Sequence, residues 1–202
     1  MALKIISGLA RGIMLDTPPD RSMRPTSGRA REALFSSLGP MHGKRFNDIF
    51  AGSGAMALEA ASRGADAVCM LEGDARHVKL IEKNINKLRK AGVTADMQVA
   101  GRRFSVSALR SMPAADIWFF DPPYAESADF LQKLLAEFTP DAPWQNALLI
   151  WELPDTAEAR SAFLRLEELP RQLDYQIRQL GGSDFLFARF RENVLSAQDV
   201  EL

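Results

Sequence analysis

The sequence predicts an α/β fold, built on a mostly parallel seven-stranded sheet with helices on both faces. From Arg45 onward, near-continuous apolar segments alternate with helical segments, which is the pattern of parallel strands buried on both faces. A tight Gly-Ser-Gly loop (residues 52–54) follows the first of these segments, and Gly181-Gly182 joins the last two. The first loop is typical of a ligand-binding strand-to-helix turn, and the second predicts a hairpin that closes the sheet with an antiparallel strand.

The composition indicates one globular domain with a small appendage. The chain has 202 residues, of which 47% are hydrophobic and 25% charged, enough for one substantial core. No apolar run approaches the roughly 20 residues that a membrane helix needs, and residues 1–12 lack the pattern of a signal peptide, so we expect a cytoplasmic protein. A single cysteine, Cys69, excludes an internal disulfide, and with only two histidines we expect no metal site. We also expect a monomer.

Charge is distributed unevenly along the chain. Residues 1–45 carry eight Lys and Arg against three Asp and Glu, a net charge of +5, whereas the remainder carries 17 against 23, a net charge of −6. A basic end on a nearly neutral protein is typical of local contact with a polyanion, although a solvated surface has the same signature.

The elements begin with a β-hairpin and a basic helix, which we assign to an N-terminal extension (residues 1–40) that contacts the polyanion. Residues 4–6 and 13–15 are short apolar strands, and glycines punctuate their connection. After a Pro- and Arg-rich stretch (17–25), residues 27–38 have apolar side chains at helical spacing, which leaves Arg29 and Arg31 pointing away from the core. Gly39-Pro40 ends this helix.

Residues 41–190 form the main domain, in which strands and helices alternate, and residues 191–202 form a polar tail. We expect strands at 46–50, 67–72, 95–99, 117–120 and 148–153, separated by helices at 55–63, 75–89, 105–111 and 128–138. After residue 155 the rhythm changes, and a helix at 157–163 precedes a hairpin with strands at 175–180 and 185–190.

The loop after the first of these strands predicts a cofactor site. It reads Phe50-Ala51-Gly52-Ser53-Gly54, and glycines allow the backbone to turn sharply and approach a ligand. The next strand ends at Glu72, 20 residues beyond Gly52, where a carboxylate can accept both hydroxyls of a ribose. A pyrophosphate-binding loop would read G-x-G-x-x-G, but Ala57 replaces the third glycine. A cofactor with a ribose and no pyrophosphate fits better and points to S-adenosylmethionine, although a plain tight turn can also read Gly-x-Gly.

The chemistry is predicted by Asp121-Pro122-Pro123-Tyr124, at the carboxyl end of the strand at 117–120, where ligands of open α/β sheets bind. The prolines stiffen the chain, carbonyls and the Asp carboxylate offer acceptors, and the Tyr ring offers a stacking face. Acceptors aimed at an amino group turn its lone pair toward an electrophile, while the site positions and desolvates the reactants. The tetrapeptide therefore predicts methyl transfer to an exocyclic amine of a nucleic-acid base.

Together these motifs resemble the class I S-adenosylmethionine-dependent methyltransferases, and the N-terminal stretch resembles the opening of the bacterial RsmD family. The resemblance covers about residues 1–155 and rests on Ile5-Ile6-Ser7-Gly8, Arg11-Gly12, Arg24-Pro25-Thr26 and residues 29–35, 50–54, 58–60, 62–65 and 121–124. Members of the family methylate N2 of one guanine in 16S ribosomal RNA, at position 966. The resemblance therefore implies that reaction, a Rossmann-like fold, S-adenosylmethionine as cofactor, and 16S rRNA of the small ribosomal subunit as partner.

Three sets of site residues are expected. The target guanine would be held by Asp121, Pro122, Pro123 and Tyr124. RNA would be contacted by Arg11, Arg24, Thr26, Arg29 and Arg31. The cofactor pocket would be lined by Asp48, Phe50, Ala51, Gly52, Ser53, Gly54, Glu72, Gly73, Arg102 and Phe104.

One position departs from the family pattern. After the third strand the family presents a Gly-Asp pair whose acid reaches the adenine amino group, whereas here Gly101 is followed by Arg102. A guanidinium cannot accept the amino hydrogens. We therefore expect adenine to be held by other groups, either backbone atoms or a stacked Phe104.

Other chemically capable side chains are assigned to packing or to solvent. We expect Cys69, Trp118, Trp144 and Trp151 in the core. At the surface we expect His42, His77 and the helical stripe Lys79, Lys83, Lys87 and Lys90.

Three other functions stay open. An adenine-N6 methyltransferase also uses Asp-Pro-Pro-Tyr but usually carries a target-recognition domain, for which 202 residues leave little room. A protein-glutamine methyltransferase would normally have Asn in place of Asp121. A non-catalytic RNA-binding assembly factor is favoured only by Arg102, and the intact tetrapeptide argues against it.

Overall fold

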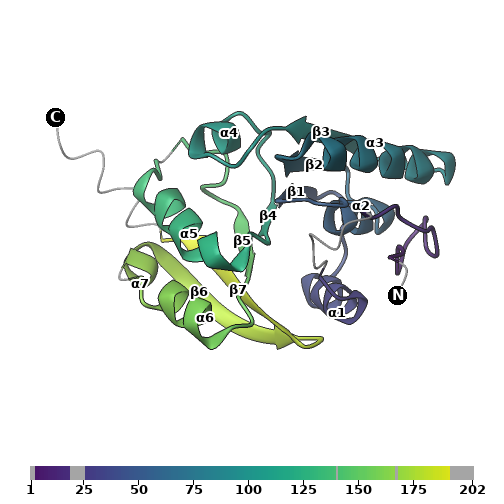
Figure 1. Cartoon of the computed structure of the whole chain (residues 1–202). Helices are drawn as coiled ribbons and strands as arrows, with labels where there is room; N and C mark the ends of the chain where they lie inside the picture. Colours follow the sequence, from purple (N-terminus) through teal and green to yellow (C-terminus); the bar gives the residue numbers. More distant parts are fainter. Residues whose placement is uncertain (1–2, 19–25, 140, 167, 192–202) are drawn as a thin grey trace.

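A seven-stranded sheet forms the centre of the molecule in the computed structural model, which describes residues 3–18, 26–139, 141–166 and 168–191 (Figure 1). The strand order is β3-β2-β1-β4-β5-β7-β6. Strands β1 to β5 pair in parallel, and β7 is antiparallel to both β5 and β6, which confirms the predicted fold class. The strands are β1 (Arg45–Ile49), β2 (Ala67–Glu72), β3 (Asp96–Gly101), β4 (Ile117–Phe120), β5 (Leu148–Glu152), β6 (Leu173–Leu180) and β7 (Ser183–Phe190).

The helices divide into two layers, one on each face of the sheet (Figure 1). The apolar side chains of the first layer pack with Phe46, Val68 and Phe119, and those of the second with Trp118, Phe120 and others on the opposite face. The first layer is α1 (Gly28–Leu38), α2 (Ala55–Ser62) and α3 (Ala75–Lys90). The second layer is α4 (Val106–Arg110), α5 (Ser127–Ala136), α6 (Ala157–Leu164) and α7 (Glu168–Gln172).

Local sequence explains where several helices begin. The Ser27 hydroxyl accepts from the Ala30 N–H at 3.1 Å, and Ser105 caps α4 in the same way. The Asp74 carboxylate accepts from the Arg76 N–H at 2.7 Å at the start of α3. Each side chain satisfies a backbone donor that has no partner inside its helix. From α1 onward the predicted helices and strands agree with the observed ones to within about two residues, except that the short α7 was not anticipated.

The N-terminal hairpin has less strand structure than the sequence predicts. A single antiparallel bridge, Lys4 to Met14, joins its arms. The connecting turn bonds to α2 instead of extending the ladder, since the N–H groups of Leu9 and Ala10 donate to the carbonyl and hydroxyl oxygens of Ser62 at 2.8 and 2.9 Å. Gly8 is required here because a Cβ would lie only 1.8 Å from the Ser62 carbonyl oxygen, and its φ is +81°.

A buried glutamate completes this docking. Glu59 of α2 is fully buried and accepts from the N–H groups of Ile6 and Ser7 at 2.8 and 3.0 Å. The Arg63 guanidinium, one turn along the helix, donates to the same carboxylate at 2.8 Å. Charged hydrogen bonds of this kind fix the hairpin to the first helix layer.

Cys69 and the three tryptophans are buried, as predicted, and His42 is exposed. His77 is buried rather than exposed, because it turns toward the end of β2 beside Glu72. Within the described ranges, no helix is long and apolar enough to cross a membrane.

Candidate active site

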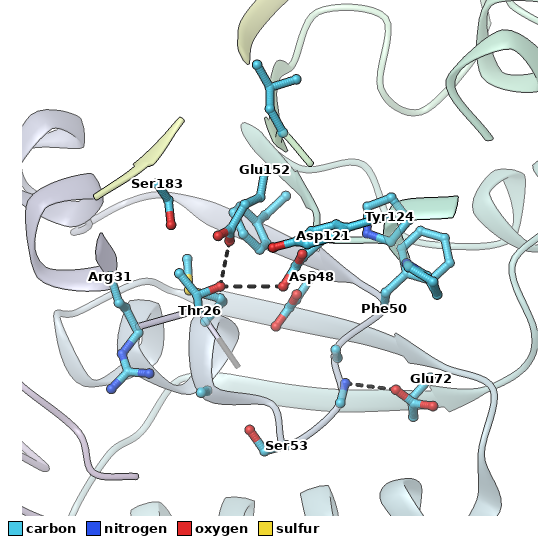
Figure 2. Close-up of a pocket in the computed structure, with 18 of the residues that line it drawn as sticks. Thr26, Arg31, Asp48, Phe50, Ser53, Glu72, Asp121, Tyr124, Glu152 and Ser183 are labelled. Carbon is cyan, nitrogen blue, oxygen red and sulfur yellow. Dashed lines mark hydrogen bonds between the residues drawn. The ribbon is translucent and has the colours of Figure 1, made fainter. Parts of the chain in front are cut away.

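A cavity of about 770 Å³ opens at the carboxyl ends of the parallel strands, where the strand order changes direction between β1 and β4 (Figure 2). Ligands of open α/β sheets bind at this kind of topological switch point. One end of the cavity is lined by the loop after β1 and the end of β2, and the other by the ends of β4 and β5. The β6–β7 turn (181–184) and the start of α1 form a further wall beside the second end.

The loop after β1 is sharply turned, as its glycines predict. Phe50, Gly52 and Gly54 have φ angles of +69°, +57° and +78°, so the chain passes three times through left-handed conformations. Phe50 is the only non-glycine residue with positive φ among the described residues, and such conformations cluster at functional sites. The N–H groups of Phe50 and Ala51 both donate to the Leu71 carbonyl at 3.1 Å, which ties the loop to β2.

Glu72 lies across the crevice from β1 and holds two backbone segments. Its Oε2 accepts from the Gly52 N–H at 2.8 Å (Figure 2). Its Oε1 accepts from the Asp74 N–H, also at 2.8 Å. The Nδ1 atom of His77 lies 3.5 Å from Oε1 and adds a donor when protonated. A carboxylate has about four acceptor sites, so Glu72 keeps capacity for hydroxyl groups of a ligand.

An aromatic cluster borders the cavity next to the loop. Phe50 stacks on Phe104 and on Phe130, with ring centroids 5.1 Å apart in each pair. Phe50 and Phe104 also line the cavity. Arg102 is exposed at the rim and its guanidinium donates to the Ser111 hydroxyl at 3.3 Å. Phe50 and Phe104 therefore present aromatic surface to this end of the cavity.

Three carboxyl groups from adjacent strands meet at the other end of the cavity. Asp48, Asp121 and Glu152 come from β1, the end of β4 and the end of β5, and the Thr26 hydroxyl lies among them (Figure 2). Thr26 Oγ1 is 2.8 Å from Glu152 Oε2 and 3.5 Å from Asp121 Oδ2. Among the described residues no group of acidic, His or Cys side chains has the arrangement of a metal site.

Burial makes two of these carboxyl groups unusually basic. Desolvation raises the pKa of Asp48 to about 7, against a backbone hydrogen bond from Ala57 that lowers it. Desolvation also raises the pKa of Asp121 well above its ordinary value, and the charges of Glu152 and Asp48 raise it further. Strongly shifted carboxyl groups in a cleft are typical of functional sites.

The three residues after Asp121 continue from the end of β4 into a short turn. Pro122 is buried and Pro123 is exposed, and a short 3₁₀ helix, Tyr124–Glu126, follows. We expected the carbonyls of this segment to be available as acceptors, but the Pro123 carbonyl accepts from the Glu126 N–H at 3.0 Å within the turn. All four residues of the tetrapeptide line the cavity.

Some of the residues expected to contact RNA are exposed in the structure, and others are buried. Arg11 and Arg29 are exposed, whereas Arg24 lies outside the described residues. Arg31 is almost completely buried, which contradicts its expected exposure: its Nη2 donates to the Lys4 carbonyl at 2.7 Å and its Nε lies 3.7 Å from Glu59. Thr26 is also buried, within the cavity rather than on a phosphate-facing surface.

Glu152 is the main site residue that sequence reasoning missed. It ends β5, the neighbour of β4, and Trp151 pairs in register with Phe120, so Glu152 and Asp121 follow that pair at the same level. Side chains alternate between sheet faces along a strand. An acid at the carboxyl end of the strand next to the tetrapeptide was therefore a signal that the sequence contained.

A family model described as "Conserved hypothetical protein 95" matches residues 3–172. The chain belongs to this family. The resemblance to RsmD enzymes is confirmed, since proteins named "Ribosomal RNA small subunit methyltransferase D" from Haemophilus influenzae and Escherichia coli are 34% and 36% identical over 60% of the chain. The aligned part is 64% and 60% of those relatives. A Bacillus subtilis protein named "Putative rRNA methyltransferase YlbH" is 34% identical over 68% of the chain and 72% of its own length.

Solved structures agree with the family and the fold. The structure titled "Putative methyltransferase yhhF from Escherichia coli" superimposes with a TM-score of 0.71 and 27% identity, covering 94% of this chain and 99% of that one. A "putative methylase" from Haemophilus influenzae gives a TM-score of 0.64 with 26% identity over 95% and 100% of the two chains. The RsmD-family chain therefore has the class I methyltransferase fold.

Proposed function

We propose that this RsmD-family protein transfers a methyl group from S-adenosylmethionine to the exocyclic N2 amine of a guanine in small-subunit 16S rRNA. The observation that carries the proposal is the position of Asp121, at the carboxyl end of β4 and in the same cavity as Glu72. One end of the cavity offers acceptors to a ribose and the other offers a carboxylate to an amine. The names of the relatives support rRNA as the substrate.

The first turn of α2 favours this cofactor over a dinucleotide. In a dinucleotide-binding fold the helix N-terminus receives a pyrophosphate. Here the Asp48 carboxyl accepts from the Ala57 N–H at 3.2 Å and already occupies that end of the helix. A carboxyl group at this point disfavours a phosphate and favours a ligand with positive charge, such as a sulfonium with an amino group.

The residues expected to hold the cofactor fit its parts. We assign Glu72 to the ribose hydroxyls, the loop 50–54 and Gly73 to close backbone approach, and Phe104 with Phe50 to the adenine ring. Asp48 and the rim residue Arg102 complete this end of the cavity. When bound, the cofactor supplies an electrophilic methyl group on sulfur.

The protein's own contribution is to orient the target amine and accept positive charge. Asp121 accepts an amine hydrogen, which directs the nitrogen lone pair toward the methyl donor, and Tyr124 stacks on the base. Positive charge that develops on nitrogen strengthens the hydrogen bond to Asp121. The raised pKa of Asp121 allows it to take the proton that the amine loses after transfer.

Tritium transfer from labelled S-adenosylmethionine onto undermethylated small-subunit particles tests this proposal. Digestion to nucleosides should place the label in N2-methylguanosine, and mapping of the rRNA should give its position. Asp121→Ala should reduce transfer by about 10²-fold or more while S-adenosylmethionine affinity in calorimetry stays near that of the parent. Label in N6-methyladenosine, or no transfer by a folded protein that binds the cofactor, would overturn the proposal.

A further inference from the structure

Glu152 lies at the acceptor end of the cavity with no role so far in the proposed reaction. It ends β5 one position after Trp151, whose register partner is Phe120, so it is level with Asp121 on the neighbouring strand. Trp151 and Phe120 stack together on one face of the sheet, and alternation directs Asp121 and Glu152 to the other face, toward Thr26. The residue is only 6% exposed, and it accepts a hydrogen bond from the Thr26 hydroxyl.

Thr26 explains how two carboxyl groups are held so close. The Thr26 hydroxyl has a single hydrogen, so it can donate fully to only one of the two carboxyl groups at a time. The shorter distance, 2.8 Å, assigns the donated hydrogen bond to Glu152 Oε2, and the longer one, 3.5 Å, involves Asp121. Thr26 therefore fixes Glu152 from the N-terminal side of the cavity, and the carboxylate retains acceptor capacity for a ligand.

We propose that Glu152 is a specificity-determining residue, which accepts the ring N1–H of guanine beside the N2 amine held by Asp121, and that Thr26 positions it. This inference rests on the proposed function. The N1–H and N2 amine of guanine are adjacent donors on one edge, whereas adenine has an acceptor at N1 beside its N6 amine. Two neighbouring carboxylates therefore match guanine, and an acceptor at N1 would face Glu152 with its lone pair unpaired.

The base 2-aminopurine distinguishes recognition of N1–H by Glu152 from recognition of the amine by Asp121. It keeps the 2-amino group of guanine but has an acceptor at N1. Small-subunit particles can be reconstituted with 16S rRNA that carries guanine or 2-aminopurine at the mapped position. We expect the parent to prefer guanine in kcat/KM by about tenfold or more, the scale of one well-placed base contact. Glu152→Gln should bring the two substrates within about threefold, because an amide can also donate to an N1 acceptor.

Thr26 variants distinguish positioning from a structural role. Thr26→Val removes the hydroxyl with little change in volume and should lower the guanine preference, whereas Thr26→Ser should restore it. S-adenosylmethionine affinity should remain at the parent value in all three variants. A parent that methylates both substrates equally, or a folded Glu152→Gln variant with unchanged preference, would overturn the assignment of Glu152 alone. Failure of the parent to methylate the guanine particles would overturn the proposed function and this inference together.

Discussion

Asp48 connects a strand, a helix and the cavity through one carboxyl group. It belongs to β1, caps the first turn of α2 through the Ala57 N–H, and lines the cavity next to the glycine loop 50–54. Its pKa is raised to about 7 mainly by desolvation, whereas an aspartate in an unfolded chain titrates near 3.9. The same group therefore binds its proton more tightly in the folded than in the unfolded protein.

The sign of this shift predicts how stability changes with pH. Because the folded pKa is the higher one, the contribution of Asp48 to stability is fully present below pH 4 and is lost as the pH rises through about 7. Asp48→Asn keeps an acceptor for Ala57 but does not titrate. Relative to this variant, the parent should lose roughly 3 kcal/mol of unfolding free energy between pH 4 and pH 8. Urea denaturation across that range measures the difference, and parallel curves for the two proteins would contradict it.

Glu72 should be the residue on which cofactor affinity depends most. Glu72→Ala removes acceptors for ribose hydroxyls and for the Gly52 N–H, so S-adenosylmethionine binding should weaken by roughly 2 to 4 kcal/mol in calorimetry. The cofactor-free protein should also become less stable, since the loop loses its anchor on β2. Glu82→Ala, which removes an exposed carboxylate from α3, should change neither quantity. Parent-like affinity in Glu72→Ala would remove Glu72 from the pocket.

At the scale of elements, the docking of the N-terminal hairpin on α2 depends on contacts between residues about 50 positions apart. Glu59 and Ser62 accept from four backbone N–H groups of the hairpin, those of Ile6, Ser7, Leu9 and Ala10, and the Ser62 hydroxyl donates to the Ser7 carbonyl. The turn at Gly8 touches the helix backbone directly. The hairpin is therefore held by its fit to α2 more than by its own strand pairing.

Two glycines of the hairpin allow a matched test of this fit. Gly8 and Gly12 have similar φ angles, +81° and +88°, but a Cβ at Gly8 would meet Ser62 whereas nothing lies within 4 Å of one at Gly12. Gly12→Ala should cost about 1 kcal/mol of unfolding free energy through backbone strain alone. Gly8→Ala should cost at least about 2 kcal/mol more, because the hairpin must move away from α2. Equal losses in urea denaturation would show that the close approach is not maintained.

The regular elements were predictable because their signals are local. Apolar runs and helical spacing gave β2 and β4 at their observed bounds, and the glycines predicted the turn after β1. The five-residue α7 is too short for a periodic signal and contains Pro170. The hairpin strands were overestimated because the donors of Leu9 and Ala10 go to α2, a partner that no local pattern identifies.

The site residues at the ends of strands could be predicted from sequence motifs. The positions of the side chains in the N-terminal segment were harder to predict. Glu72 and Asp121 follow from strand ends, and Glu152 could have been found by the same rule. The burial of Arg31 depends on Glu59 and the Lys4 carbonyl, both far away in sequence. Likewise His77 looks exposed on its own helix and is buried only because β2 ends beside it.

For the molecule as a whole, RNA binding should depend on charge at the N-terminal end. Arg11 and Arg29 are exposed there, so we expect Arg11→Ala with Arg29→Ala to lower the slope of log affinity for 16S rRNA against log salt by about one to two units. Cofactor affinity should not change, because the cofactor loop lies beyond β1. Lys79→Ala with Lys83→Ala removes the same charge from α3 and should leave the slope unaltered. If both double variants shift it equally, binding follows net charge and not this surface.

The place of β7 in the sheet determines when a nascent chain can complete its cavity. β7 pairs with β5 on one side and β6 on the other, and the turn that precedes it walls the cavity near Thr26 and Glu152. A chain that ends with β5 contains the glycine loop and Asp121, but the edge of β5 is uncovered. Thr26 emerges early in synthesis and Ser183 late, so the acceptor end of the cavity is assembled only when translation has passed both. A chain that ended before residue 181 would therefore leave the edge of β5 uncovered and would lack this wall of the cavity.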